Sequence, residues 1–101
     1  MSLDYALQVF FAALQDGISS DQPPRRRLED LCAATLDKLR GNEGLRDDIS
    51  YRIQQLREAR PRIHQISESD VKSLLKEIVS IYEAIAAQLY STGRTKAVPN
   101  A

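Results

Sequence analysis

The chain has 101 residues, of which 43% are apolar, and its 14 basic and 14 acidic residues cancel at neutral pH. This length fits one domain, and the apolar fraction excludes a chain that is disordered throughout. The balanced charge excludes a large field of one sign that would draw the chain to nucleic acid or to anionic lipid. We therefore expect one folded domain that meets any charged partner through local groups.

The first predicted helix covers residues 3–16 and contains the stretch YALQVFFAAL, in which Gln8 is the only plainly polar residue. This apolar run is too short to span a bilayer, and Asp4 stands where a signal peptide needs positive charge. We therefore expect no membrane anchor, no signal peptide and no membrane partner. Gly17 is expected to end the helix in the left-handed conformation that other residues resist.

Two further helices are predicted over residues 24–40 and 44–60. Pro24 suits the first position of a helix, where the backbone donor that proline lacks would be unused. Pro61 is expected to end or kink the third helix, because it also restricts the residue before it. The apolar or small residues at helical spacing are Leu28, Leu31, Cys32, Thr35, Leu36 and Leu39, followed by Leu45, Ile49, Ile53 and Leu56.

The strongest helix pattern covers residues 68–91. Ser67 and Asp70 form a capping box, in which the first side chain bonds the backbone at the start of the helix. Apolar residues then recur at spacings of three and four, namely Val71, Leu74, Leu75, Ile78, Ile81, Tyr82, Ile85 and Leu89. Residues 91–101 lack this periodicity and are expected to form a flexible tail or linker.

The connections between these helices are short, and short connections place successive helices antiparallel. We therefore predict an all-α fold, an up-down four-helix bundle that forms one domain over residues 1–90. Dimerisation is a further way to complete this bundle.

No catalytic, cofactor or metal site is expected. Cys32 lies on the apolar stripe of the second helix, where a small buried hydrophobe is the simplest interpretation. His64 stands between two isoleucines, close after Pro61, whereas a phosphorelay histidine needs an exposed place in mid-helix. A single cysteine forms no intramolecular disulfide, which favours the cytoplasm. We predict a non-enzymatic protein and keep a phosphorelay or chaperone-like bundle as an alternative.

Nucleic-acid binding is the main alternative, because the chain has ten arginines against four lysines. The guanidinium group of arginine can bind a phosphate through two N–H groups at once. Residues 1–50 contain six basic and nine acidic side chains, a net charge of −3, and residues 51–101 contain eight and five, a net charge of +3. The arginines gather in two groups, at 25–27 and 52–62. Solvated charge with local pairs is the simpler interpretation of both groups. The candidate contacts to phosphate or to an acidic partner are Arg25, Arg26, Arg27, Arg57 and Arg60.

The first helix is apolar on nearly every side, and such a helix must be enclosed. Each helix of a four-helix monomer leaves one face outward, so we predict contact with a protein partner or a second copy, with the fourth helix assisting. Phe11 is turned about 100° from Phe10 around the helix, so its burial depends on a wide contact. The predicted interface residues are Leu7, Phe10, Phe11 and Leu14. The predicted function is that of a small cytosolic regulator, adaptor or oligomerisation domain. Alternatively, Val9 and Ala12 or Ala13 are merely exposed, which is ordinary for small side chains.

Overall fold

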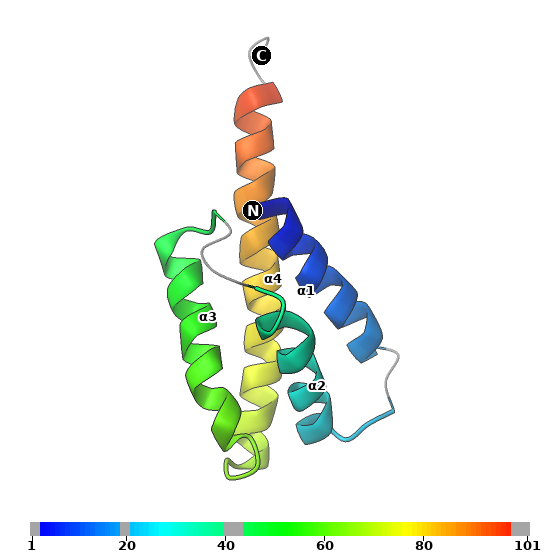
Figure 1. The fold of residues 1–101 in the computed structure, drawn as a ribbon. Coiled ribbons are helices and arrows are strands. Elements are labelled where there is room, and N and C mark those ends of the chain that lie inside the picture. Colours follow the sequence, from blue (N-terminus) through cyan, green and yellow to red (C-terminus); the bar gives the residue numbers. More distant parts are fainter. Residues whose placement is uncertain (1–2, 19–20, 40–43, 98–101) are drawn as a thin grey trace.

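The computed structural model describes residues 3–18, 21–39 and 44–97. Within these ranges the chain forms α1 (Leu3–Ile18), α2 (Pro24–Leu36), α3 (Asp47–Ala59), the 3-10 turn η1 (Arg60–Arg62) and α4 (Glu68–Ala97). Successive helices run in opposite directions, and α1, α2 and α3 all pack against α4, which forms the long column of the molecule (Figure 1). The predicted all-α four-helix bundle is therefore confirmed.

One apolar core lies between the four helices. Its largest fully buried side chains are Phe10, Leu28, Leu36, Ile49, Leu56, Ile63, Ile78, Ile81 and Ile85. Among the described residues, Thr35 is the buried polar side chain, and its Oγ1 donates to the carbonyl oxygen of Leu31 at 2.7 Å. Because this hydroxyl has a partner within its own helix, its burial leaves no polar group unsatisfied. The four helices of one copy thus close a complete core.

The second helix ends earlier than predicted, at Leu36 and not at residue 40. A turn follows, and Leu39 folds back onto the core with 4% of its surface exposed. Arg57 of α3 donates to the carbonyl oxygens of Leu36 at 3.2 Å and of Leu39 at 3.1 Å. These are acceptors that the end of a helix leaves without partners. A tertiary contact therefore replaces the last turn that the sequence predicts.

The third helix begins at Asp47, three residues later than the predicted start at residue 44. Gly44 has a φ of 77°, so the chain turns here in the left-handed conformation. The side-chain amide of Gln88, on α4, accepts from the backbone N–H of Arg46 at 3.1 Å and donates to the carbonyl oxygen of Gly44 at 3.0 Å. One side chain of α4 thus supplies the hydrogen bonds that helical backbone would have made.

The connection from α3 to α4 follows the prediction from Pro61. α3 ends at Ala59, one 3-10 turn contains the proline, and Ile63 is buried in the core at 2% exposure. The capping prediction is also confirmed, because Oγ of Ser67 accepts from the backbone N–H of Asp70 at 3.1 Å.

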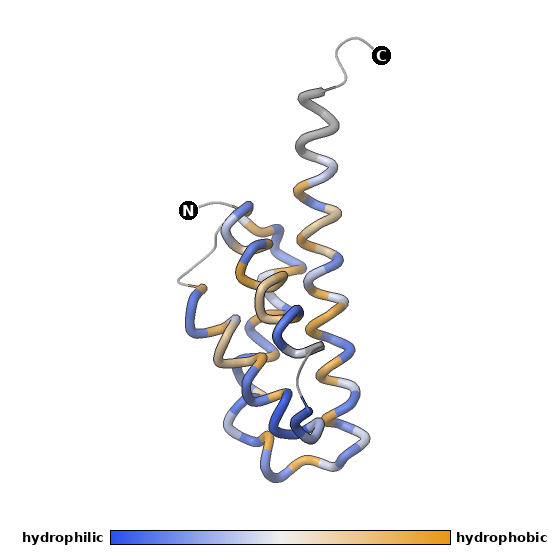
Figure 2. Tube along the Cα trace, turned by 90° about the vertical axis from the view of Figure 1, so that its right-hand side faces the viewer, coloured by the Kyte–Doolittle hydropathy of each residue, from blue (hydrophilic) through white to orange (hydrophobic). Residues whose placement is uncertain are grey.

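The fourth helix continues past the predicted end at about residue 91 and reaches Ala97. This end of α4 projects beyond the other helices, as Figures 1 and 2 both show. No other described helix packs alongside this end, so it has no apolar face to bury, which agrees with the loss of apolar periodicity in the sequence. The backbone hydrogen bonds of the helix do not depend on such packing and continue. The expected tail is therefore helical as far as Ala97, and residues 98–101 lie outside the described ranges.

Gly17 does not end α1 as a left-handed cap, because the helix continues through it to Ile18. A Cβ added at this position would lie 3.4 Å from Cδ2 of Leu31 on α2, which is van der Waals contact. The glycine is thus a helical residue at the point where α1 approaches α2.

Replacing Gly17 with alanine should stabilise the fold by about 0.5 to 1 kcal/mol, because alanine loses less backbone entropy in a helix and meets no clash here. Urea unfolding of the two proteins measures the difference. Gly44→Ala is the matched control, since a side chain at a φ of 77° should instead cost about 1 to 2 kcal/mol. A loss of stability in Gly17→Ala would mean that Leu31 cannot accommodate the methyl group.

Candidate protein-interaction face

An apolar surface lies where α1 and α4 run side by side. Phe11 of α1 is 47% exposed and Val79 of α4 is 42% exposed. The ring of Phe11 lies against that of Tyr82, with 6.2 Å between centroids and a tilt of 31°. The two helices therefore share one continuous apolar surface, whose middle is the contact between these rings.

We call this surface the α1/α4 face. Its members are Leu7, Phe11 and Leu14 on α1, and Leu75, Val79, Tyr82 and Ala86 on α4. The α1 residues are four and three apart, and those of α4 are four, three and four apart, so each set lies on one side of its helix. Apart from the more exposed Phe11 and Val79, the members are half-buried.

The structure separates the interface residues that the sequence predicts. Leu7, Phe11 and Leu14 do lie on the α1/α4 face, with Leu7 and Leu14 also packed against the core. The inclusion of Phe10 needs correction, because it is fully buried in the core of its own chain. The step of about 100° between neighbouring helical residues turns Phe10 inward and Phe11 outward.

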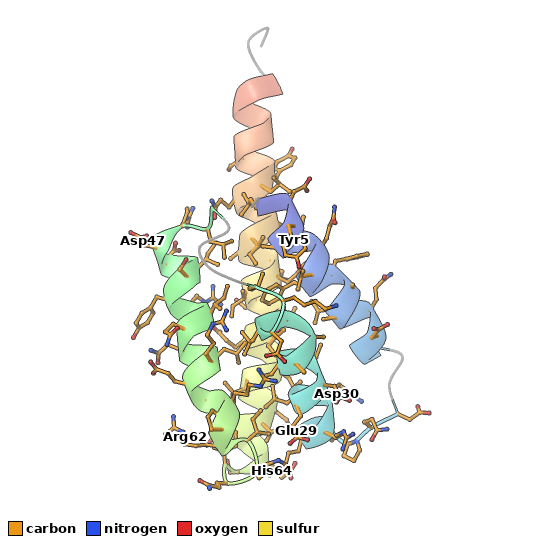
Figure 3. The ribbon with its side chains drawn as sticks, viewed as in Figure 1. Tyr5, Glu29, Asp30, Asp47, Arg62 and His64 are labelled. Carbon is orange, nitrogen blue, oxygen red and sulfur yellow. The ribbon has the colours of Figure 1, made fainter. Side chains whose placement is uncertain are left out.

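Among the described residues, the other large hydrophobic side chains that are exposed are tyrosines outside this face. Tyr51 of α3 and Tyr90 of α4 are each 66% exposed, and Tyr5 of α1 is 36% exposed. The hydroxyl of Tyr5 donates to the carbonyl oxygen of Lys38 at 3.3 Å (Figure 3 labels Tyr5). A tyrosine keeps its hydroxyl in water at little cost, so these residues are weaker indicators of a partner than Phe11.

The predicted arginine contacts mostly point back into the chain. Arg25, at the start of α2, donates through one guanidinium nitrogen to the carbonyl oxygens of Ile63 and Ile66, the latter at 2.9 Å. A second nitrogen donates to Glu68 at 3.0 Å. Arg25 thus clamps the connection between η1 and α4 onto α2, and its side chain is only 25% exposed.

Arg60 and Arg52 make fork-shaped pairs within the bundle. Arg60 donates to both carboxylate oxygens of Asp37, at 2.7 and 3.1 Å, and this hydrogen bonding lowers the pKa of Asp37. Arg52 donates to both carboxylate oxygens of Glu77 and to the hydroxyl of Ser80 at 2.6 Å, and the bonds to Glu77 raise the pKa of Arg52. Two-pronged pairs of this kind fix orientation as well as charge.

The remaining members of the first arginine group differ in exposure. Arg26 is 63% exposed and lies 3.5 Å from Asp30 one turn later, the local pair that the simpler interpretation predicts. Arg27 is half-buried and donates to the carbonyl oxygen of Gln22 at 3.2 Å. The contacts of Arg26 and Arg27 are thus local to the start of α2, whereas those of Arg25, Arg57 and Arg60 join different helices and connections.

His64 and Cys32 do not meet. His64 lies in the turn before α4, where its Nε2 contacts a carboxylate oxygen of Glu29 on α2 (Figure 3). Cys32 is fully buried in the core, and burial raises the pKa of its thiol to about 11. A thiol in this setting stays protonated at neutral pH, so the structure does not activate it as a nucleophile.

A hollow of about 260 Å³ opens between α1 and α2. Its lining combines small apolar groups with charged ones, namely Ala13, Asp16, Gly17, Arg27, Asp30, Leu31 and Ala34. The charges of opposite sign offset one another, and Asp30 already pairs with Arg26. The lining therefore favours no one class of ligand.

Within residues 3–18, 21–39 and 44–97, no three side chains of His, Cys, Asp or Glu lie close enough together to bind a metal ion. In the same part of the chain no helix combines the length and the apolar character needed to cross a membrane. Comparison of the chain with models of known families, with curated proteins and with solved structures gives no match.

Proposed function

We propose that this chain is a non-enzymatic protein-interaction module that forms a homodimer through the α1/α4 face. The observation that carries the proposal is the exposure of Phe11 and Val79, at 47% and 42%, on either side of the half-buried Tyr82. Water contact with a clustered apolar surface costs free energy, and burying it against another protein regains that free energy.

The completeness of the core supports this proposal. Phe10, Ile78, Ile81 and Ile85 are fully buried within one copy, so the core is closed without burial of Phe11 and Val79. The exposed side chains of Phe11 and Val79 contribute little to the core and are available for association. The same surface on two copies can be joined by a two-fold axis, which is the commonest way in which identical chains associate.

The proposal includes a role as a regulator, adaptor or oligomerisation domain in the cytoplasm. The free thiol of Cys32 supports the cytoplasmic part, because reducing compartments keep such thiols intact. Nucleic acid is not the proposed partner, since the guanidinium groups of Arg25, Arg57 and Arg60 already bind carbonyls and carboxylates of the chain itself.

Light scattering at micromolar concentration should give a mass near twice 11.4 kDa for the wild-type chain. Phe11→Ser should weaken the dimer by about 2 kcal/mol or more, as expected for a central aromatic residue of an interface. Tyr51→Ser is the matched control, because Tyr51 is an exposed aromatic on α3 and should leave the dimer unchanged. A wild-type monomer, or a dimer that Phe11→Ser leaves intact, would refute the proposal.

A further inference from the structure

The fourth helix carries two apolar stripes next to each other. The inner stripe is Val71, Leu74, Ile78, Ile81 and Ile85, which pack in the core. The outer stripe is Leu75, Val79, Tyr82 and Ala86, spaced by four, three and four residues, and its half-buried Leu75 and Tyr82 also touch the core. This spacing follows the repeat of about 3.5 residues that keeps one helix in register with a second helix along its length. The outer stripe therefore has the pattern of a helix-pairing seam.

Resting on the homodimer proposed above, we infer that the outer stripe of α4 packs antiparallel against the outer stripe of a second copy. The two-fold axis then crosses α4 between Val79 and Tyr82, at the middle of the stripe. Val79 of each copy faces Tyr82 of the other, and Leu75 faces Ala86. Each layer thus pairs a larger side chain with a smaller one, which lets the two helices approach closely.

Phe11 lies beside this axis, because its ring contacts Tyr82 at 6.2 Å between centroids. Association through α4 would therefore also cover the most exposed large hydrophobic residue of α1. This explains how the first helix loses its exposed apolar surface although α4 supplies the main contact.

The charges next to the outer stripe select the antiparallel arrangement. Lys76 and Glu83 each follow a stripe residue, Leu75 and Tyr82, and both are exposed. Neither forms a salt bridge within the part of the chain that the structure describes. Seven residues along a helix separate them by about 10 Å, too far for them to pair with each other. An antiparallel partner brings Glu83 of one copy to Lys76 of the other, twice by symmetry.

A parallel pair of α4 helices would not use these charges. In that arrangement the positions that flank Lys76 and Glu83 across the seam are those of Val71 and Ile78, which are both fully buried in the core of their own chain. Charge complementarity therefore points to a second copy in the antiparallel orientation.

Reversal of single charges tests this register. Lys76→Glu brings two acidic groups together at both symmetric sites, and Glu83→Lys brings two basic groups together. Each variant should dimerise about tenfold more weakly than the wild type in sedimentation equilibrium. Glu58→Lys, a charge reversal at an exposed position of α3, is the matched control and should dimerise like the wild type. Circular dichroism should show the same helix content in all four proteins.

Mixing the two variants is the decisive step. A pair formed by one Lys76→Glu chain and one Glu83→Lys chain regains opposite charges at both sites, so it should recover wild-type affinity and exclude the two homodimers. The double variant should likewise recover wild-type affinity. The antiparallel register would be wrong if both single variants dimerised like the wild type, or if mixing them did not restore the affinity. Either result would leave the homodimer itself unchallenged. A wild-type chain that stays monomeric would overturn the homodimer and the register together.

Discussion

Replacing Phe10 with alanine should lower the free energy of unfolding by about 3 to 5 kcal/mol, enough to unfold a large share of the molecules at 37 °C. Phe10 is fully buried and lies in the core cluster formed by all four helices. Removing its ring would leave a cavity among side chains that belong to different helices and cannot all move inward. Urea unfolding followed by circular dichroism measures the loss.

Phe11→Ala is the matched control for this substitution, because it removes the same ring from the next residue. Phe11 is 47% exposed, so its loss should cost the monomer only about 1 kcal/mol. Both variants should be measured at concentrations low enough to keep the chain monomeric, since dimerisation would add its own stabilisation. Equal losses of stability in the two variants would contradict the assignment of Phe10 to the core and Phe11 to the surface.

Most of the fold could be predicted from the sequence, because the helices are specified by apolar spacing and capping residues that lie close together in the chain. The stripe through Ile78, Ile81 and Ile85, the capping residue Ser67 and the helix stop before Pro61 each rest on backbone rules that act within a few residues. The ends of helices were less predictable. α2 stops at Leu36 because Arg57 binds the carbonyl oxygens there, and a residue on another helix leaves no mark in the local sequence.

The glycines show the same limit. Gly17 and Gly44 both have the composition signal of a helix boundary, but only Gly44 adopts a positive φ. At Gly17 the close approach of Leu31 decides the role of the residue, and that approach depends on how α1 packs against α2. The sequence therefore indicates that a glycine has a structural role, but it does not show whether that role is a positive φ or close packing of two helices.

The α1/α4 face could be predicted in part. The step of about 100° per residue already separates Phe11 from Phe10, although it does not say which of the two faces outward. The sequence predicts that the fourth helix assists this contact, but it names no residue there, and Val79 falls outside the apolar stripe that the spacing selects. The spacing of Leu75, Val79, Tyr82 and Ala86 as a second seam was the signal that could have divided that stripe in two.

The arginine groups could be interpreted from sequence only in part. The local pair of Arg26 with Asp30 was predictable, but the partners of Arg25 and Arg60 are carbonyl and carboxylate oxygens far along the chain. Arg25 reaches Ile66, 41 residues away, and Arg60 reaches Asp37, 23 residues away. Composition records that the guanidinium groups exist, whereas only the fold determines which acceptors they meet.

Replacing Arg25 with alanine should therefore destabilise the fold by about 2 to 3 kcal/mol, the range for hydrogen bonds that a charged donor makes. The substitution leaves the carbonyl oxygens of Ile63 and Ile66 without this donor and releases the connection before α4 from α2. Arg25→Lys should recover only part of the loss, because an ammonium group cannot reproduce the fork that reaches both carbonyls and Glu68. Urea unfolding at low protein concentration measures all three proteins.

Arg26→Ala is the matched control for the Arg25 variants, because Arg26 is the next residue, carries the same charge and is 63% exposed. Its removal should change the free energy of unfolding by less than about 0.5 kcal/mol. A phosphate-binding role for the group 25–27 predicts the opposite pattern, in which both alanine variants keep their stability and both weaken a salt-dependent binding to nucleic acid. If Arg25 holds the bundle together, Arg25→Ala should be much less stable than Arg26→Ala. If the group binds an external anion, the two alanine variants should be equally stable.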